Sequence, residues 1–240
     1  MNSDPSLPPA LLLDLDDTIL ADSASAEGCW DVVCSGYAPA LGLDDRLLLQ
    51  AIDARRRWFW QGPARHRRGR MDLAAARVEI IVAALGELGV VAAAEAEAMA
   101  GAFGALREQR LAPFDGAVEA LARLRAAGVR MALVTNGAGP AQRRKIERFG
   151  LARYFDGIVV EGEFGAGKPE AQVFRYALGM VAARPEEAWM VGDNLEWDVA
   201  GAQAVGMAGV WVDFMGQGLA VGGSVRPDRV IGNLGDLLRT

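Results

Sequence analysis

Histidine, cysteine and lysine are scarce in this chain of 240 residues, which has one His, two Cys and only two Lys among its 25 basic residues. His66, Cys29 and Cys34 do not supply the ligand set of a Cys/His zinc site. A lone His without a Gly-x-Ser-x-Gly segment also argues against a serine-hydrolase triad. Two Cys give no disulfide framework and indicate a reducing compartment. We therefore expect a cytoplasmic protein in which both thiols are buried as small apolar groups.

Long apolar runs and an excess of basic charge are missing as well. The longest apolar runs, such as 80–85, are far shorter than the roughly 20 residues of a membrane span. The N-terminal segment 1–9 is polar and proline-rich, which is not the pattern of a secretory signal. A net charge of −6 argues against general nucleic-acid binding. We expect neither a membrane nor nucleic acid as a partner.

Short apolar runs alternate with helical patterns over most of the chain. The predicted strands are 10–15, 129–134, 157–160, 188–191, 209–212 and 228–231. The predicted helices that follow them are 118–127, 140–149, 170–181, 196–205 and 234–239. This alternation is typical of βαβ units and predicts an α/β fold: a three-layer, Rossmann-like parallel sheet with helices on both faces.

Residues 21–111 have a different composition and periodicity, with many Ala and with apolar residues at helical spacing. Helices are predicted over 47–60, 71–88 and 93–110. The sequence therefore predicts two domains, an α/β core formed by 1–20 and 112–240 and a helical domain inserted over 21–111.

Chemically active side chains lie at the ends of the predicted strands or shortly after them. They are Asp14, Asp16, Thr135, Asn136, Asp193 and Asp198, with Lys168 in a further loop. The carboxyl ends of parallel strands meet at one edge of a sheet, where ligands bind. Close carboxylates do not all stay ionised without a nearby cation, and carboxylates without His favour Mg²⁺ over Zn²⁺. The alternative is that these are ordinary turn residues, because Asp and Asn favour loops.

Four segments, in this order, resemble the four motifs of the haloacid dehalogenase (HAD) superfamily of hydrolases. They are LLLDLDDT (11–18), LVTNG (133–137), GKP (167–169) and VGDNLEWD (191–198). The resemblance covers residues 10–240, and the helical insert is similar to the family's C1-type cap.

The resemblance implies hydrolysis of a small phosphorylated metabolite, a phosphate monoester, through an aspartyl-phosphate on Asp14. Asp16 would protonate the leaving alcohol and then activate water. Lys168 would balance the charges of Asp14 and the phosphate. The phosphoryl oxygens would be held by Thr135 and by the backbone N–H groups of Asn136 and Gly137.

The same resemblance implies Mg²⁺ as the cofactor. Its ligands would be the carboxylates of Asp14 and Asp193 and the backbone carbonyl of Asp16. Asp198 would hold a metal-bound water or orient Lys168. Neutralising the phosphate charge is what lets a carboxylate attack it.

Alternatives on the same fold are a sugar-phosphate mutase, a 2-haloacid dehalogenase and a catalytically silent phosphate-binding or interaction protein. Asp16 favours phosphate esters, because the dehalogenase branch lacks a second aspartate at this position. The segment 162–169 nearly matches a P-loop, but Pro169 replaces the Ser or Thr that would bind Mg²⁺. The identity of the ester and the oligomeric state, monomer or homodimer, stay open.

An Arg-rich stretch over 55–70 stands out in the helical insert. Arg65, His66, Arg67 and Arg70 are candidate contacts to an anionic substrate, since guanidinium groups suit phosphate and carboxylate. The alternative is a solvated basic helix face over core aromatics. Lys145, outside this stretch, is predicted to be a plain helix-surface residue at which Arg serves equally well.

Overall fold

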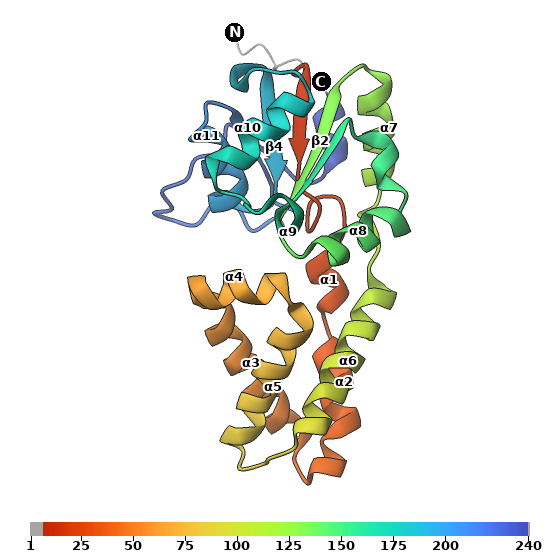
Figure 1. Ribbon diagram of the computed structural model, residues 1–240, viewed down its shortest axis with the longest axis vertical. Coiled ribbons are helices and arrows are strands. Elements are labelled where there is room, and N and C mark those ends of the chain that lie inside the picture. Colours follow the sequence, from red (N-terminus) through yellow and green to blue (C-terminus); the bar gives the residue numbers. More distant parts are fainter. Residues whose placement is uncertain (1–6, 240) are drawn as a thin grey trace. The chain divides into compact units, whose positions relative to one another are not determined.

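The computed structural model describes residues 7–239, so the polar segment 1–6 and Thr240 lie outside the described part. The chain divides into two compact units. One contains the residues up to Ala21 and those from Ala112 onward, and the other is Asp22–Leu111. Each unit has a hydrophobic core of its own. Figure 1 shows the sheet in the first unit and only helices in the second.

The first unit is built on a six-stranded parallel sheet of order β3-β2-β1-β4-β5-β6. Its strands are β1 (Ala10–Leu13), β2 (Arg130–Thr135), β3 (Gly157–Val160), β4 (Ala188–Gly192), β5 (Ala208–Val212) and β6 (Arg229–Ile231). β1 and β4 are central and buried almost throughout, which explains their nearly continuous apolar sequences. The predicted α/β class with a parallel sheet is confirmed.

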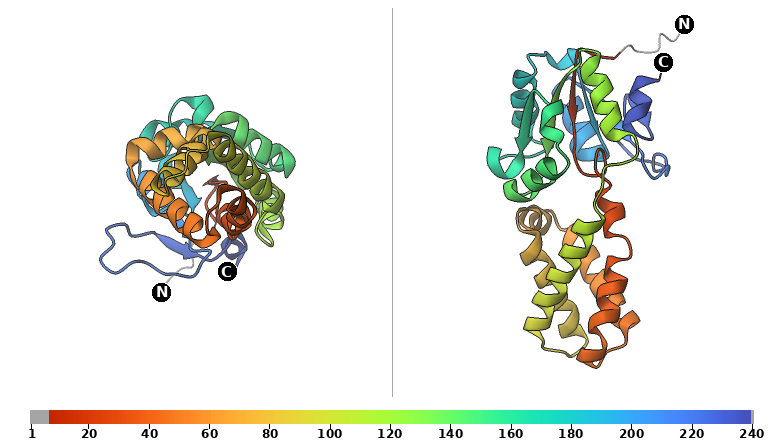
Figure 2. Two further views of the ribbon diagram at one scale, coloured as in Figure 1. Left: turned by 90° about the horizontal axis from the view of Figure 1, so that it is seen from below. Right: turned by 90° about the vertical axis from the view of Figure 1, so that its right-hand side faces the viewer.

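Helices cover both faces of this sheet, as Figure 2 shows for α10 on one face and α7 on the other. The α-helices are α7 (Ala117–Ala126), α8 (Gly139–Arg148), α9 (Glu161–Phe164), α10 (Ala171–Met180) and α11 (Gly201–Gln203). The 3₁₀- and π-helical turns are η2 (Leu151–Tyr154), η3 (Pro185–Glu187), η4 (Leu195–Ala200) and η5 (Leu234–Leu238). The first strand is shorter than predicted, because the chain turns directly after Leu13.

The predicted helix 196–205 differs most from the structure. It begins as η4, a π-helical turn, and continues as the short α11. Asn194 caps this turn, because its Oδ1 accepts hydrogen bonds from the backbone N–H groups of Glu196 and Trp197 at 3.1 and 2.9 Å. π-Helical turns are rare and often mark functional sites. This one lies directly after β4, among the predicted site residues.

The second unit, hereafter the helical unit, holds more helices than the sequence predicts. They are α1 (Asp22–Ala26), α2 (Cys29–Tyr37), η1 (Pro39–Leu41), α3 (Asp45–Gln61), α4 (Pro63–Met71), α5 (Leu73–Glu87) and α6 (Ala93–Arg110). α3 packs against α5, α5 against α6, and α2 against both α3 and α6. Cys29 and Cys34 are free and buried in this core, as predicted. Within residues 7–239, no helix combines the length and apolar character of a membrane-crossing segment.

Candidate active site

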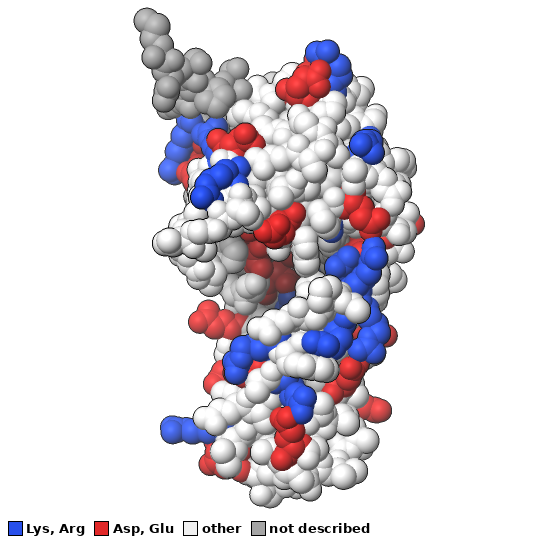
Figure 3. All heavy atoms as spheres, turned by 90° about the vertical axis from the view of Figure 1, so that its left-hand side faces the viewer, with Lys and Arg blue, Asp and Glu red and all other residues white. Residues whose placement is uncertain are grey.

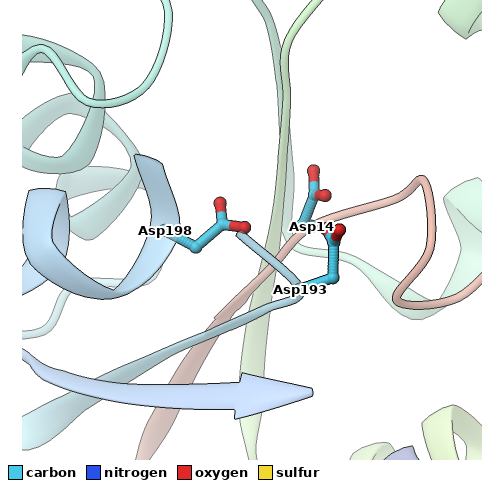
Figure 4. A group of neighbouring side chains, drawn as sticks. All are labelled: Asp14, Asp193 and Asp198. Atoms are coloured by element: carbon cyan, nitrogen blue, oxygen red, sulfur yellow. The ribbon is translucent and has the colours of Figure 1, made fainter. Parts of the chain in front are cut away.

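Three carboxylates meet at the carboxyl edge of the sheet. Asp14 follows β1, Asp193 follows β4 and Asp198 lies on η4, with one carboxylate oxygen of each within 4.8 Å of the others. Figure 4 shows the three carboxyl groups converging from these separate elements. The backbone N–H of Asp14 donates to the carbonyl of Val191 at 2.9 Å, which ties the end of β1 to β4.

Lys168 lies buried between two of these carboxylates. Its Nζ is 2.6 Å from Asp14 Oδ1 and 2.6 Å from Asp198 Oδ1, and only 3% of its side chain is exposed. Asn136 fixes the backbone at this point from two sides. Its Oδ1 accepts from the Lys168 N–H at 2.8 Å, and its Nδ2 donates to the Lys168 carbonyl at 2.9 Å.

Burial and mutual repulsion shift the pKa values of this cluster. Burial raises the pKa of Asp14 to about 7 against the opposing effect of Lys168. Burial and then the charges of Asp14 and Asp198 raise the pKa of Asp193 to about 9. Although burial acts to lower it, the pKa of Lys168 is raised by the charges of Asp14 and Asp198. One ammonium group therefore does not compensate three carboxylates, and a bound cation would favour their ionised forms.

The donor set fits a hard divalent cation. Asp14, Asp193 and Asp198 offer only carboxylate oxygens, close enough together to share one ion. The aromatic ring of Trp211 secures this region from β5, because its Nε1 donates to the Asp193 carbonyl at 2.8 Å. Gly192 is needed here, since a Cβ at this position would lie 2.2 Å from Asp198 Oδ2.

Asp16 is held by two residues of α8 that the sequence did not single out as site residues. Its Oδ2 accepts from Gln142 Nε2 at 2.8 Å, and its Oδ1 is 2.7 Å from Lys145 Nζ. The same Gln142 nitrogen lies 2.6 Å from Thr135 Oγ1, so one buried amide joins two of the predicted site residues. The prediction that Lys145 is a plain surface residue is wrong, because it is ion-paired with Asp16. Gln142 and Lys145 lie three residues apart on one helix face, but nothing in the sequence shows that this face packs against Asp16.

The three residues at the end of β2 and directly after it, Thr135, Asn136 and Gly137, make different contacts. Thr135 is buried, with its hydroxyl next to Gln142. The backbone N–H of Gly137 was expected to hold a phosphoryl oxygen, but it donates to Glu161 Oε2 at 2.9 Å. Glu161, buried at the start of α9, was not predicted as a site residue. The phosphate-binding role of Asn136 stays a prediction for its backbone N–H, since its side chain holds the Lys168 loop.

The four residues of the helical unit that were predicted to contact substrate all lie on α4. Arg65 folds back on the end of α3: its Nη2 donates to the Trp58 carbonyl at 2.6 Å, and its guanidinium lies 3.6 Å from the centroid of the Trp58 ring. His66 packs edge-on against Trp60, and Arg70 approaches His66 Nδ1 at 3.5 Å. Arg65 thus has local contacts with α3, and substrate contact by Arg65, His66, Arg67 and Arg70 stays a prediction.

Comparison with known proteins agrees with this geometry. Residues 8–206 match the model of the haloacid dehalogenase-like hydrolase family. The chain belongs to this family. It is 36% identical over 236 residues to the phosphoserine phosphatase of Thermus thermophilus, a match that covers 85% of this chain and 88% of the relative. It is also 42% identical over 108 residues to the ribulose-1,5-bisphosphate 5-phosphatase of Halopiger xanaduensis, covering 45% and 44% of the two chains. Because these relatives are phosphatases and the family model matches, the chain is an HAD-like phosphatase.

Solved structures of HAD proteins have the same fold. The HAD phosphatase from Thermococcus onnurineus superposes with a TM-score of 0.64 at 26% identity and covers 95% of each chain. The putative HAD-hydrolase YfnB from Bacillus subtilis, bound to magnesium, superposes with a TM-score of 0.73 at 22% identity and covers 97% of each chain. At that lower identity the second likeness concerns the fold alone.

Proposed function

We propose that this HAD-like phosphatase hydrolyses a phosphate monoester of a small metabolite, depends on Mg²⁺, and forms an aspartyl-phosphate on Asp14. The observation that carries the proposal is the position of Asp14, buried at a strand end with Lys168 Nζ at 2.6 Å and two further carboxylates beside it. A nucleophile in this setting attacks phosphorus while the ammonium group balances charge on the transferred group.

Asp14, Asp193 and Asp198 would hold the Mg²⁺, together with the backbone carbonyl of Asp16. When bound, the ion supplies positive charge that lets an anionic carboxylate approach an anionic phosphate. Lys168 keeps Asp14 oriented, and Asn136 keeps the Lys168 loop in place through its two hydrogen bonds. Thr135 would offer its hydroxyl to a phosphoryl oxygen.

Asp16 would deliver a proton to the leaving oxygen and afterwards accept one from the attacking water. Its two carboxylate oxygens are held by different groups, Gln142 and Lys145, so its direction is fixed from two sides. Gln142 also contacts Thr135, which links the proposed proton donor to the proposed phosphate contact.

The proposed substrate class is the small phosphorylated metabolites. The relative from Thermus thermophilus that matches 85% of this chain is a phosphoserine phosphatase, and other relatives have names of sugar-phosphate phosphatases. A small phosphorylated metabolite such as phosphoserine is therefore the first substrate to test. The helical unit would act as the cap, and the cytoplasm as place of action stays a prediction from the scarcity of Cys.

Metal removal tests the proposal directly. We expect the purified protein to release phosphate from para-nitrophenyl phosphate with Mg²⁺, to stop when EDTA is in excess, and to recover when Mg²⁺ is restored. The physical reason is that a bound cation favours the ionised forms of the three carboxylates and offsets their charge, which would otherwise repel a phosphate dianion. Phosphate release that continues unchanged in EDTA would contradict metal dependence. Halide release from 2-chloropropionate in place of phosphate release would favour the dehalogenase alternative.

The raised pKa values predict that metal binding displaces protons. With pKa values of about 7 for Asp14 and about 9 for Asp193, both carboxyl groups hold protons below those values, and metal ligation requires the ionised forms. We therefore expect Mg²⁺ affinity to fall as the pH falls from 8 to 6. Calorimetry in buffers of different ionisation enthalpy should give different apparent binding enthalpies at pH 7. Identical enthalpies in all buffers would show that no proton leaves.

The contact between Gln142 and Asp16 predicts an effect that depends on the leaving group. Gln142→Ala should lower kcat for a poor leaving group, an alkyl phosphate, by roughly 10- to 100-fold, because Asp16 loses one of its two fixing contacts. The loss should be small for para-nitrophenyl phosphate, whose leaving group needs little proton transfer. In the Asp16→Ala background the same substitution should have only the smaller effect of freeing Thr135, whose hydroxyl also contacts Gln142. Equal losses with both esters and in both backgrounds would mean a general structural defect.

A further inference from the structure

The helical unit contains a cavity of about 720 Å³ with an aromatic wall. Trp30 and Phe103 both line it and stack with their ring centroids 4.1 Å apart. Two guanidinium groups lie over this pair, Arg56 at 5.6 Å from the Trp30 centroid and Arg77 at 5.2 Å from the Phe103 centroid. No role for Trp30 follows from the sequence, and none of these four residues belongs to the site proposed above.

Two buried hydrogen-bond donors among the cavity-lining residues have no acceptor. The indole N–H of Trp30, a residue only 4% exposed, has no partner in the described part of the chain, and neither does Nε of Arg107. A buried donor without an acceptor destabilises the fold, because it has given up its hydrogen bonds to water without replacing them. An oxygen atom that accepts hydrogen bonds would satisfy either donor.

Arg77 adds a positive charge to the cavity and, unlike Arg107 and Arg56, it is not ion-paired with any residue that the structure describes. Arg107 is ion-paired with Asp22, and Arg56 is 2.7 Å from Asp53. Arg77 has no ion pair or hydrogen bond with any carboxylate among residues 7–239, although the charge of Asp22 acts on it at longer range. Burial and then the charge of Arg107 lower the pKa of Arg77 to about 10. The positive charge of Arg77 is therefore not neutralised by a paired carboxylate within this described range.

We propose that this cavity binds an anionic oxygen group, a carboxylate or phosphate of a small molecule, through Arg77, the indole N–H of Trp30 and Nε of Arg107. Planar guanidinium groups form strong, charge-assisted hydrogen bonds with such oxyanions. The Trp30–Phe103 pair offers an apolar surface to the remainder of the ligand. Glu27 and Asp31 line the cavity at exposed positions, where water screens their charge.

On the face that Figure 3 draws, the basic residues of the helical unit do not form one uniform patch. Figure 3 shows Lys and Arg side chains over this unit, with Asp and Glu side chains between them. Surface charge alone therefore does not define an anion site here. The proposal rests on the cavity and on its unpaired donors.

The indole N–H of Trp30 is itself the reporter in a binding experiment. The full chain is labelled with ¹⁵N-tryptophan, and the Trp30 resonance is identified by its loss in Trp30→Phe. Sodium malonate and inorganic phosphate are the two probes, titrated at ionic strength kept constant with chloride. We expect a saturable shift of the Trp30 resonance with at least one probe, because its N–H gains an acceptor.

Arg77→Gln should raise the Kd of that probe roughly tenfold or more, the effect of losing one charge-assisted contact. The matched control is Arg57→Gln, which removes the same charge from an exposed position on α3 that does not line the cavity. If Arg77→Gln does not fold, Arg77→Lys tests the same contact with the charge kept and the planar fork removed. A Trp30 resonance that responds to neither probe, or that responds equally with Arg77 replaced, overturns the proposal.

A kinetic arm distinguishes a substrate group from a separate ligand. O-phosphoserine and O-phosphoethanolamine differ by one carboxylate. If the bound anion belongs to the substrate, Arg77→Gln lowers kcat/KM for the first ester and leaves the second unchanged. If a separate small molecule is bound, both esters are hydrolysed as before while the Trp30 response is still lost. Since binding is read at Trp30, it does not depend on whether the strand-end carboxylates catalyse phosphate hydrolysis.

Discussion

We expect Asp14→Asn to fold like the natural chain and to lose turnover of every phosphate ester by on the order of 10⁴-fold or more. The substitution keeps the size of the side chain but removes the carboxylate that would form the bond to phosphorus. It also leaves Lys168 with Asp198 as its remaining anionic partner, so the lysine stays paired. The loss should therefore appear in kcat, with little change in thermal stability. Rapid-quench analysis should find no phosphorylated protein.

A matched control lies three residues further along. Asp17→Asn makes the same chemical change in the same loop, at a position with φ of 57° that Asn tolerates as well as Asp does. Because Asp17 has no role in the proposed reaction, this variant should keep most of its activity. Near-natural turnover by Asp14→Asn would mean that another group attacks phosphorus, and the aspartyl-phosphate proposal would fall.

The sheet and its acidic edge could be predicted because the signals are local. Each strand of this parallel sheet is buried and reads as a short apolar run, and the residue that follows each run lies at the same edge of the sheet. That is why Asp14, Thr135 and Asp193 could be grouped from their places after strands, whereas Lys168 lies in a loop after α9 and is grouped with them by the motif resemblance. Strand β3 was predicted with its observed limits, and β1, β2, β4, β5 and β6 differ by one or two residues.

The contacts that support these residues could not be predicted, because they depend on how distant segments pack. Gln142 approaches Asp16 across 126 residues of sequence, and Glu161 approaches the Gly137 amide across 24. Polar residues at such positions look like ordinary helix-surface residues until the helix is placed on the sheet. Trp211 is similar: its apolar ring predicts packing, but the hydrogen bond from its Nε1 to the Asp193 carbonyl has no sequence signal.

In the helical unit, too, local sequence patterns could be predicted and contacts between distant segments could not. α3, α5 and α6 have apolar residues at helical spacing and were predicted within two residues at either end. α4 was missed because it is dominated by Arg and has no apolar periodicity, although Pro63 at its first turn is a typical start signal. Trp30 could not be placed because its stacking partner, Phe103, lies on another helix.

Lys168→Arg should keep the positive charge and still lower kcat by roughly 100- to 1000-fold, comparable to removing a charge-stabilising donor. Lys168 Nζ fits between two carboxylate oxygens at 2.6 Å each, in a position where 3% of the side chain is exposed. The adjacent backbone is equally tight, since a Cβ on Gly167 would lie 2.6 Å from Asn136 Oδ1. A planar guanidinium is larger than an ammonium group, so it must displace Asp14 or Asp198.

Lys145→Arg provides the comparison, because it makes the same change at the only other lysine. Lys145 is 17% exposed and pairs with Asp16, so a guanidinium has more room to keep that ion pair than it has at Lys168, which is 3% exposed. We expect its loss of kcat to be at least tenfold smaller than that of Lys168→Arg, and to be largest for poor leaving groups because Asp16 is the group affected. Equal losses at the two positions, measured under saturating Mg²⁺, would show that the confined geometry around Lys168 is not what requires lysine.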